Sequence, residues 1–305
     1  MPITTLKNIV NIASHAFPVQ VVVLCGLIGC SEPQSPRPSI AERDTTGISV
    51  SGAILLEGEM VVIPPPSLLS HIIAMESIPF ENHCLSDPSH PEQWTSEHSK
   101  ALNLGVLGAD LSYLINHEQT TSIPQYLAAI RRLTDNLGIS QEVHPELLNQ
   151  IEAGLDNPAQ VLGLHGVFFR NLESYLNNNN RSDISTCILL GGWTESMYQL
   201  LLSDNAHKSE SLHRLLVDQT YCAQGIRALA DKIDNPALKE YQSLIKQLCS
   251  ALEAFERTYE KKEPLHDANA GVTYLRGQSN VQYTDAQWQE LTERVIETRK
   301  QIVTI

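Results

Sequence analysis

Two segments in the middle of the chain each place an acid three residues before a tyrosine, close to glycines. The first is residues 105–113 (GVLGADLSY), with Asp110, and the second is residues 191–198 (GGWTESMY), with Glu195. Residues three apart share one face of a helix. A pair of carboxyl groups in one cleft is what general acid–base catalysis uses. The pattern indicates an interior site formed by these residues: Asp110, Tyr113, Glu195, Tyr198 and Trp193.

The surroundings of both acids predict that they are buried. On a helix, apolar residues or glycines stand three or four positions from each acid. A glycine inside a helix costs about 1 kcal/mol relative to alanine, which suggests that the two helices approach closely at residues 105, 108, 191 and 192. An unpaired buried carboxylate is costly, so it takes up a proton or pairs with a cation. The candidate cations are four arginines: Arg131, Arg132, Arg170 and Arg181.

Two interpretations of Asp110 and Glu195 stay open. In the first they are an acid and a base that face each other in a cleft between helices. In the second they are structural acids, each bound to an arginine or to the amides at a helix end. A pocket lined by both acids with no cation nearby would favour an enzyme. Acids bound to arginine would favour a binding or structural protein.

Other signatures of enzymes and metal sites are absent from the sequence. It has no HExxH motif, no Cys/His cluster of zinc spacing, no GxSxG motif, and neither a phosphate-binding loop nor a dinucleotide fingerprint. His83, Cys84 and His90 share one loop but lack that spacing, and His165 is predicted to be a packed interior histidine. We therefore expect no metal and no cofactor, and a non-enzymatic protein is favoured.

The elements that position these residues are predicted to be helices from about residue 64 onward. Leucine and isoleucine recur at helical spacing, and Ser, Thr or Asn, often followed by Pro or an acid, marks the helix starts. After a first helix near residue 68, the expected helices cover about 96–117, 122–138, 144–155, 157–180, 183–203, 209–233, 236–259 and 284–303. Their short connections imply antiparallel neighbours. The sequence therefore predicts an all-α fold, an array or bundle of about eight or nine antiparallel helices.

Two segments alternate in the manner of short strands. Residues 48–63 alternate loosely around Glu57 and Glu59, and residues 272–283 alternate around a polar turn at 276–280. Alternation on either side of a turn is typical of a β-hairpin. We expect one or two short hairpins beside the helices.

The N-terminal region resembles a bacterial lipoprotein signal. An apolar run from Val19 ends in Leu27-Ile28-Gly29-Cys30, and a polar, proline-rich stretch follows. The run is much shorter than the roughly 20 apolar residues that a membrane-spanning helix needs. The resemblance implies that Cys30 is acylated and becomes the N-terminus; an ordinary cleaved signal peptide is the alternative. The expected organisation is a signal peptide (1–29), a flexible tether (30–63) and a helical domain (64–305).

The charge and the anchor define the expected partners and location. A net charge of −14 repels nucleic acid and anionic headgroups. The expected partners are the lipid bilayer, through acylated Cys30, and an envelope protein, peptide or glycan. Ser31 stands where an aspartate is associated with inner-membrane retention. The expected location is therefore the cell envelope, the outer membrane rather than the inner one.

Four cysteines remain in the mature region. They are Cys84, Cys187, Cys222 and Cys249. An extracytoplasmic site permits disulfides, whereas a cysteine in an apolar helix is usually a small buried hydrophobe. Both alternatives stay open.

The chain resembles uncharacterised helical lipoproteins of the Bacteroidetes type. The resemblance rests on residues 100–113 (KALNLGVLGADLSY), 181–184 (RSDI), 191–198 (GGWTESMY) and 284–288 (TDAQW). It implies a location and a helical fold but no activity. We therefore expect a lipid-anchored, non-enzymatic binding or assembly module of the envelope. The alternatives are an envelope enzyme that uses Asp110 and Glu195 as acid and base, and a structural spacer.

Overall fold

The computed structural model describes most of the chain from residue 53 onward, which includes the last part of the predicted tether. The described residues are 53–56, 59–62, 66–76, 78–140, 145–203, 210–267 and 272–304. The predicted signal peptide, Cys30 and the tether up to residue 52 lie outside them. The described chain divides into a helical unit, which contains residues 53–256 and 283–304, and a second unit that contains residues 257–282.

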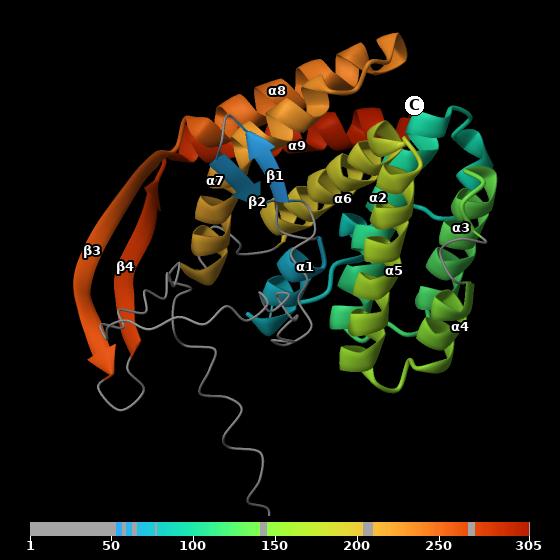
Figure 1. Cartoon of the computed structure of the whole chain (residues 1–305), viewed down its shortest axis with the longest axis horizontal. Helices are drawn as coiled ribbons and strands as arrows, with labels where there is room; N and C mark the ends of the chain where they lie inside the picture. The colour runs from blue at the N-terminus through green and yellow to red at the C-terminus, as the bar shows by residue number, and fades with distance from the viewer. Residues whose placement is uncertain are drawn as a thin grey trace, which may run out of the picture. The chain divides into compact units, whose positions relative to one another are not determined.

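The helical unit confirms the predicted all-α class (Figure 1). Its α-helices are α1 (Pro66–Met75), α2 (Glu97–Asn116), α3 (Ile123–Asn136), α4 (Pro145–Ala153), α5 (Pro158–Asn178), α6 (Ser182–Leu202), α7 (Glu210–Asp231), α8 (Lys239–Glu253) and α9 (Asp285–Thr304). The described chain also contains the short 3-10 helices η2 (Asn82–Cys84), η3 (Pro91–Gln93) and η5 (Pro236–Leu238). Among the described helices, none is both long enough and apolar enough to cross a membrane.

Capping residues explain where several helices begin and end. The Ser96 side chain accepts a hydrogen bond from Ser99 N–H at the start of α2, and Asn157 does the same for Gln160 N–H at the start of α5. Gly138 ends the segment after α3 with φ +68°, a conformation that glycine adopts at little cost.

The predicted hairpin within residues 48–63 is present. β1 (Ala53–Leu56) pairs antiparallel with β2 (Glu59–Val62), with Ala53 opposite Val62 and Leu56 opposite Glu59. Both strands contact α7.

The predicted hairpin within residues 272–283 is wrong in its pairing. Residues 272–282 form one strand, β4 (Val272–Gln282), and its partner is β3 (Glu256–Asp267), whose first residues, 256–259, were predicted to end a helix. The glycine that suggested a turn, Gly277, has another use. A Cβ at that position would overlap the hydroxyl of Tyr259 on β3, so glycine makes room for a cross-strand tyrosine.

α2 and α6 form the centre of the helical unit. Every residue from 101 to 115 of α2 is buried, and α2 packs more extensively on α6 than on any other helix. A Cβ on Gly105 would overlap the backbone of Ile188, and one on Gly191 would overlap the backbone of Leu102. The predicted close approach of the two helices is therefore confirmed at Gly105 and Gly191, whereas a Cβ on Gly108 would overlap the ring of Phe169 on α5. Glycine is needed at these two contacts because backbone meets backbone.

Candidate functional site

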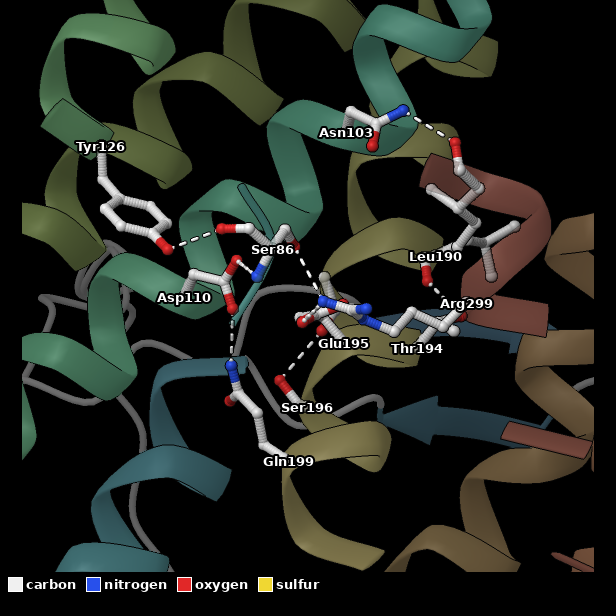
Figure 2. Close-up of polar contacts among 12 residues, drawn as sticks. Ser86, Asn103, Asp110, Tyr126, Leu190, Thr194, Glu195, Ser196, Gln199 and Arg299 are labelled. Carbon is white, nitrogen blue, oxygen red and sulfur yellow. Dashed lines mark hydrogen bonds and ion pairs between the residues drawn. The ribbon is translucent and has the colours of Figure 1, made fainter. Parts of the chain in front are cut away.

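Asp110 on α2 and Glu195 on α6 are both fully buried, with 0% of their surface exposed. Asp110 Oδ2 accepts a hydrogen bond from Ser86 N–H at 3.0 Å, and Oδ1 accepts one from the Gln199 side-chain amide at 2.9 Å. Tyr126 OH donates to the carbonyl of Ser86 at 2.6 Å. Figure 2 shows Asp110 between the Ser86 loop and α6. Asp110 therefore ties these two elements to α2.

Glu195 forms a two-point ion pair with Arg299 on α9. The Nε and Nη2 atoms of Arg299 donate to the two carboxylate oxygens at 2.8 and 3.0 Å (Figure 2). Nη2 also donates to Ser86 Oγ at 3.1 Å, and the guanidinium lies 4.2 Å from the ring centroid of Tyr198. Bidentate geometry and a stacked aromatic ring are arrangements that arginine makes and lysine does not.

Arg299 thus influences both buried acids: it binds Glu195 directly and acts on Asp110 through its charge. Burial raises the pKa of Asp110 well above its ordinary value, and the charge of Glu195 adds to this effect. Arg299 and the hydrogen bond from Ser86 lower the pKa of Asp110 only in part. Burial by itself would lower the pKa of Arg299, but Glu195 holds it above its ordinary value. The cluster is therefore electrically balanced when Glu195 and Arg299 are charged and Asp110 keeps its proton.

The predicted cations are not the partners of these acids. Arg131 pairs with Glu152, Arg132 with Glu92 and Arg181 with Glu97, while Arg170 lies on α5 without an acid partner among the described residues. The true partner, Arg299, stands four residues after buried Val295 and three before buried Ile302. Its place on the apolar side of α9 marks it in the sequence as a cation that faces the interior, although this spacing does not show which acid it binds.

The structure divides the five residues of the predicted interior site. Asp110, Glu195 and Tyr198 join the network around Arg299, whereas Tyr113 and Trp193 lie outside it. Tyr113 OH accepts a hydrogen bond from Glu81 N–H at 3.2 Å. Trp193 Nε1 donates to Gln219 Oε1 at 2.9 Å.

A cluster that could hold a metal lies in the loop where the sequence placed His83 and Cys84. Ligand atoms of Glu81, His83 and Cys84 lie within 4.8 Å of one another, and His90 is not among them. A direct contact between His83 Nε2 and Glu81 Oε2 at 3.1 Å accounts for this proximity without a metal. Burial and then Glu81 raise the pKa of Cys84 to about 12, so the thiol keeps its proton at neutral pH.

The four cysteines of the helical unit are buried and form no disulfide with one another. Of the two alternatives for them, the structure supports small buried hydrophobes. The thiols of Cys187 and Cys249 have pKa values raised chiefly by burial, and that of Cys249 is about 12. Such thiols are poor nucleophiles.

A cleft of about 890 Å³ opens beside α5. We call it the α5 cleft. Residues from α1, α2, α5, α6 and α7 line it, among them Leu68, Gly105, Gly108, Ala109, Leu162, Gly163, His165, Gly166, Phe169, Arg170, Glu173, Asp183, Ile188, Leu189, Gly192, Leu229 and Lys232. Asp110 and Glu195 do not line it. Figure 1 shows α5 beside α2 and α6, the two helices that supply much of its wall.

His165 is a buried polar group in the wall of the cleft, with 4% of its surface exposed. Its Nε2 lies 2.9 Å from the carbonyl of Gly108, which can only accept, so Nε2 carries the proton. Burial lowers the pKa of His165 to about 4, so the imidazole is neutral at physiological pH. Nδ1 is then an acceptor, and no described residue donates to it. The prediction of a packed interior histidine is confirmed, with one acceptor left unused.

Two glycines of α5 face the open space of the cleft. A Cβ on Gly163 would meet no atom within 4 Å, and one on Gly166 would meet only Arg170 Nη1 at 3.8 Å. These glycines differ from Gly105 and Gly191, where a Cβ would strike a neighbouring helix. Glycine destabilises a helix interior relative to alanine, and a Cβ would fit at both positions. The two glycines therefore indicate that this wall of the cleft favours small residues.

No protein-family model, curated protein or solved structure matches this chain. The function is therefore argued from the geometry of the helical unit and from the sequence.

Proposed function

We propose that the protein is a lipid-anchored binding module of the cell envelope that takes its ligand in the α5 cleft. The observation that carries this proposal is the cleft itself. Its volume of about 890 Å³ lies within the range of roughly 300–1,000 Å³ that is typical of ligand sites. Its wall is largely apolar and contains a few polar groups without partners, which is also typical of such sites.

The geometry of the acids supports a binding module over an enzyme. Both oxygens of Glu195 are held by Arg299, and both oxygens of Asp110 accept hydrogen bonds from the protein. Neither acid lines the α5 cleft, so neither is placed to exchange a proton with a molecule bound there. A structural spacer, in turn, needs no cleft of this size.

The anchor in this proposal rests on the sequence. The LIGC motif ending at Cys30 resembles a lipobox, and acyl chains on Cys30 would hold the protein at the outer membrane. The tether would let the helical unit stand away from the bilayer. Cys30→Ala should abolish metabolic labelling with palmitate and release the protein from the membrane fraction. Unchanged labelling in this variant would refute the anchor.

The binding role is tested by native mass spectrometry of the lipoprotein purified from its own envelope. We expect a bound mass beyond the acyl groups. The variant Gly163→Leu/Gly166→Leu adds two bulky side chains to the cleft, at positions where a Cβ meets open space or one arginine nitrogen, and should lose this mass. Gln150→Leu, an exposed position on α4, is the matched control and should keep it. If no bound mass is found, or if the cleft-filling variant retains it, the α5 cleft is not the binding site.

A further inference from the structure

We infer that the ligand of the α5 cleft is a short peptide with apolar side chains and free termini. The inference rests on the proposed function, because it names the ligand class of the same site. It is carried by the polar groups that the cleft leaves without partners and by the balance of charge on its wall.

The first of these groups is the guanidinium of Arg170. It lies beside Gly166 in the wall of the cleft, and no described residue accepts a hydrogen bond from it or pairs with it. A guanidinium is charged at all physiological pH values and binds a carboxylate with two parallel hydrogen bonds. Arg170 is therefore suited to bind an anionic group of the ligand, and the terminal carboxylate of a peptide is such a group.

The second group is a carboxyl group. Nδ1 of His165 also lacks a donor among the described residues, but this atom is buried and has no surface open to the cleft, so it is not part of the proposed site. Glu173 stands one turn beyond Arg170 on α5, is partly buried, and has no cation within bonding distance in the described chain. Burial raises its pKa, which a bound ammonium group would reverse.

The charge on the wall is balanced. Two cations, Arg170 and Lys232, and two acids, Glu173 and Asp183, line the cleft of a protein whose net charge is −14. Asp183 already pairs with His98 at 3.0 Å. Such a wall complements a molecule that carries both charges, and a peptide with free termini is one.

Other ligand classes satisfy fewer of these groups. A fatty acid supplies a carboxylate for Arg170 but leaves Glu173 without a cation. A neutral glycan supplies donors but no charge for Arg170, and the apolar parts of the wall, such as Leu162, Phe169 and Ile188, gain nothing from its hydroxyl groups.

The experiment is a calorimetric titration of the full chain carrying Cys30→Ala, which needs no detergent. The probes are trileucine with free termini, its N-acetylated form, its C-terminal amide, and dodecanoate. We expect one trileucine per chain. Arg170→Met keeps the aliphatic stem and should weaken trileucine at least tenfold while leaving the C-terminal amide unaffected. Glu173→Gln should weaken trileucine but not its N-acetylated form. Arg132→Met, outside the cleft, is the matched control and should change nothing.

Two results would overturn the inference. One is that trileucine fails to bind at millimolar concentration or binds Arg170→Met as tightly as the parent chain. The other is that dodecanoate binds and trileucine does not displace it. If the bound mass from the envelope is lost in Gly163→Leu/Gly166→Leu while trileucine does not bind, the proposed function stands and the peptide is wrong. If that mass is absent or retained, both fail.

Discussion

Arg299 and Glu195 form a two-point ion pair across 104 positions of sequence. The pair fastens the last helix, α9, to the central helix α6, and Arg299 also reaches the loop at Ser86. Because Glu195 has no exposed surface, water cannot replace Arg299 if the pair is broken. The pair therefore stabilises the packing of α9 on α6, and removing one partner leaves the other as an unpaired buried charge.

Replacing Glu195 by Gln should strongly destabilise the fold. The substitution preserves the shape of the side chain but leaves the Arg299 guanidinium without its counter-charge, which typically costs about 3–5 kcal/mol. The free energy of unfolding in urea measures this loss. Arg294→Met is the control, because Arg294 makes only exposed pairs with Glu290 and Glu297, and should cost less than about 1 kcal/mol. Equal losses in the two variants would contradict a structural role for Glu195.

Asp110→Asn should behave in the opposite way. The raised pKa of Asp110 favours its protonated form, which asparagine resembles in shape and charge. The asparagine oxygen can keep the bond from Ser86 N–H, and its amide can donate to Gln199 Oε1, a buried acceptor that has no partner among the described residues. This donation needs only a rotation of the Gln199 amide. Asp110→Ala, which leaves both donors unpaired, should cost about 1–3 kcal/mol for each donor.

The sign of the pH dependence follows from the same raised pKa. A carboxyl group whose folded pKa exceeds its unfolded value of 3.8 adds stability that is full below that value and is lost as the pH rises through the folded pKa. The asparagine side chain of the Asp110→Asn variant does not titrate. The variant should therefore gain stability relative to the parent chain as the pH rises above 3.8 towards the raised folded pKa of Asp110. A stability difference that is constant over this range would show that Asp110 does not carry a raised pKa.

Local signals allowed the sequence to predict most of the helices and the burial of both acids. The caps at Ser96 and Asn157 and the glycine at 138 act within one turn of a helix, so no distant contact is needed to recognise them. The partner of Glu195 could not be identified in this way, since it lies on a helix that only the tertiary fold brings near. The charged, exposed strand β3 gave no apolar alternation that would distinguish it from a helix end.

His165 should give the helical unit an acid-sensitive stability. Burial lowers its pKa from 6.5 to about 4. Between pH 6.5 and pH 4 this histidine is therefore protonated in the unfolded chain and neutral in the folded chain. Stability should therefore fall as the pH is lowered from about 6.5 towards 4. Asp110 acts in the opposite direction in an overlapping range, so the measurement is made in the Asp110→Asn background. His165→Gln in that background should flatten the dependence; an unchanged slope would assign it to another group.

The α5 cleft could not be predicted from the sequence. Hydrophobic periodicity shows which face of a helix is apolar, but it does not show whether another helix covers that face. Leu162 and Leu172 have the spacing of core residues, and the sequence offers no way to see that the space beside them is open. The only local sign is the pair Gly163 and Gly166, two glycines in the interior of one helix. The sequence shows glycines at 105, 108, 191 and 192 equally clearly, and only the structure separates those that allow contact from those that face a space.

That separation gives the last prediction. Gly163→Ala and Gly166→Ala add a methyl group that meets open space or one arginine nitrogen, so each should stabilise the fold by about 0.5–1 kcal/mol through helix propensity. Gly105→Ala and Gly191→Ala drive the same methyl group into the backbone of the facing helix and should cost about 1–3 kcal/mol or more. Thermal and urea unfolding of the four variants measures both signs. If the α5 alanines stabilise the fold yet weaken binding of trileucine, the glycines are kept for the ligand and not for the fold. If they destabilise it, the space beside α5 is filled by packing, and the cleft cannot serve as a site.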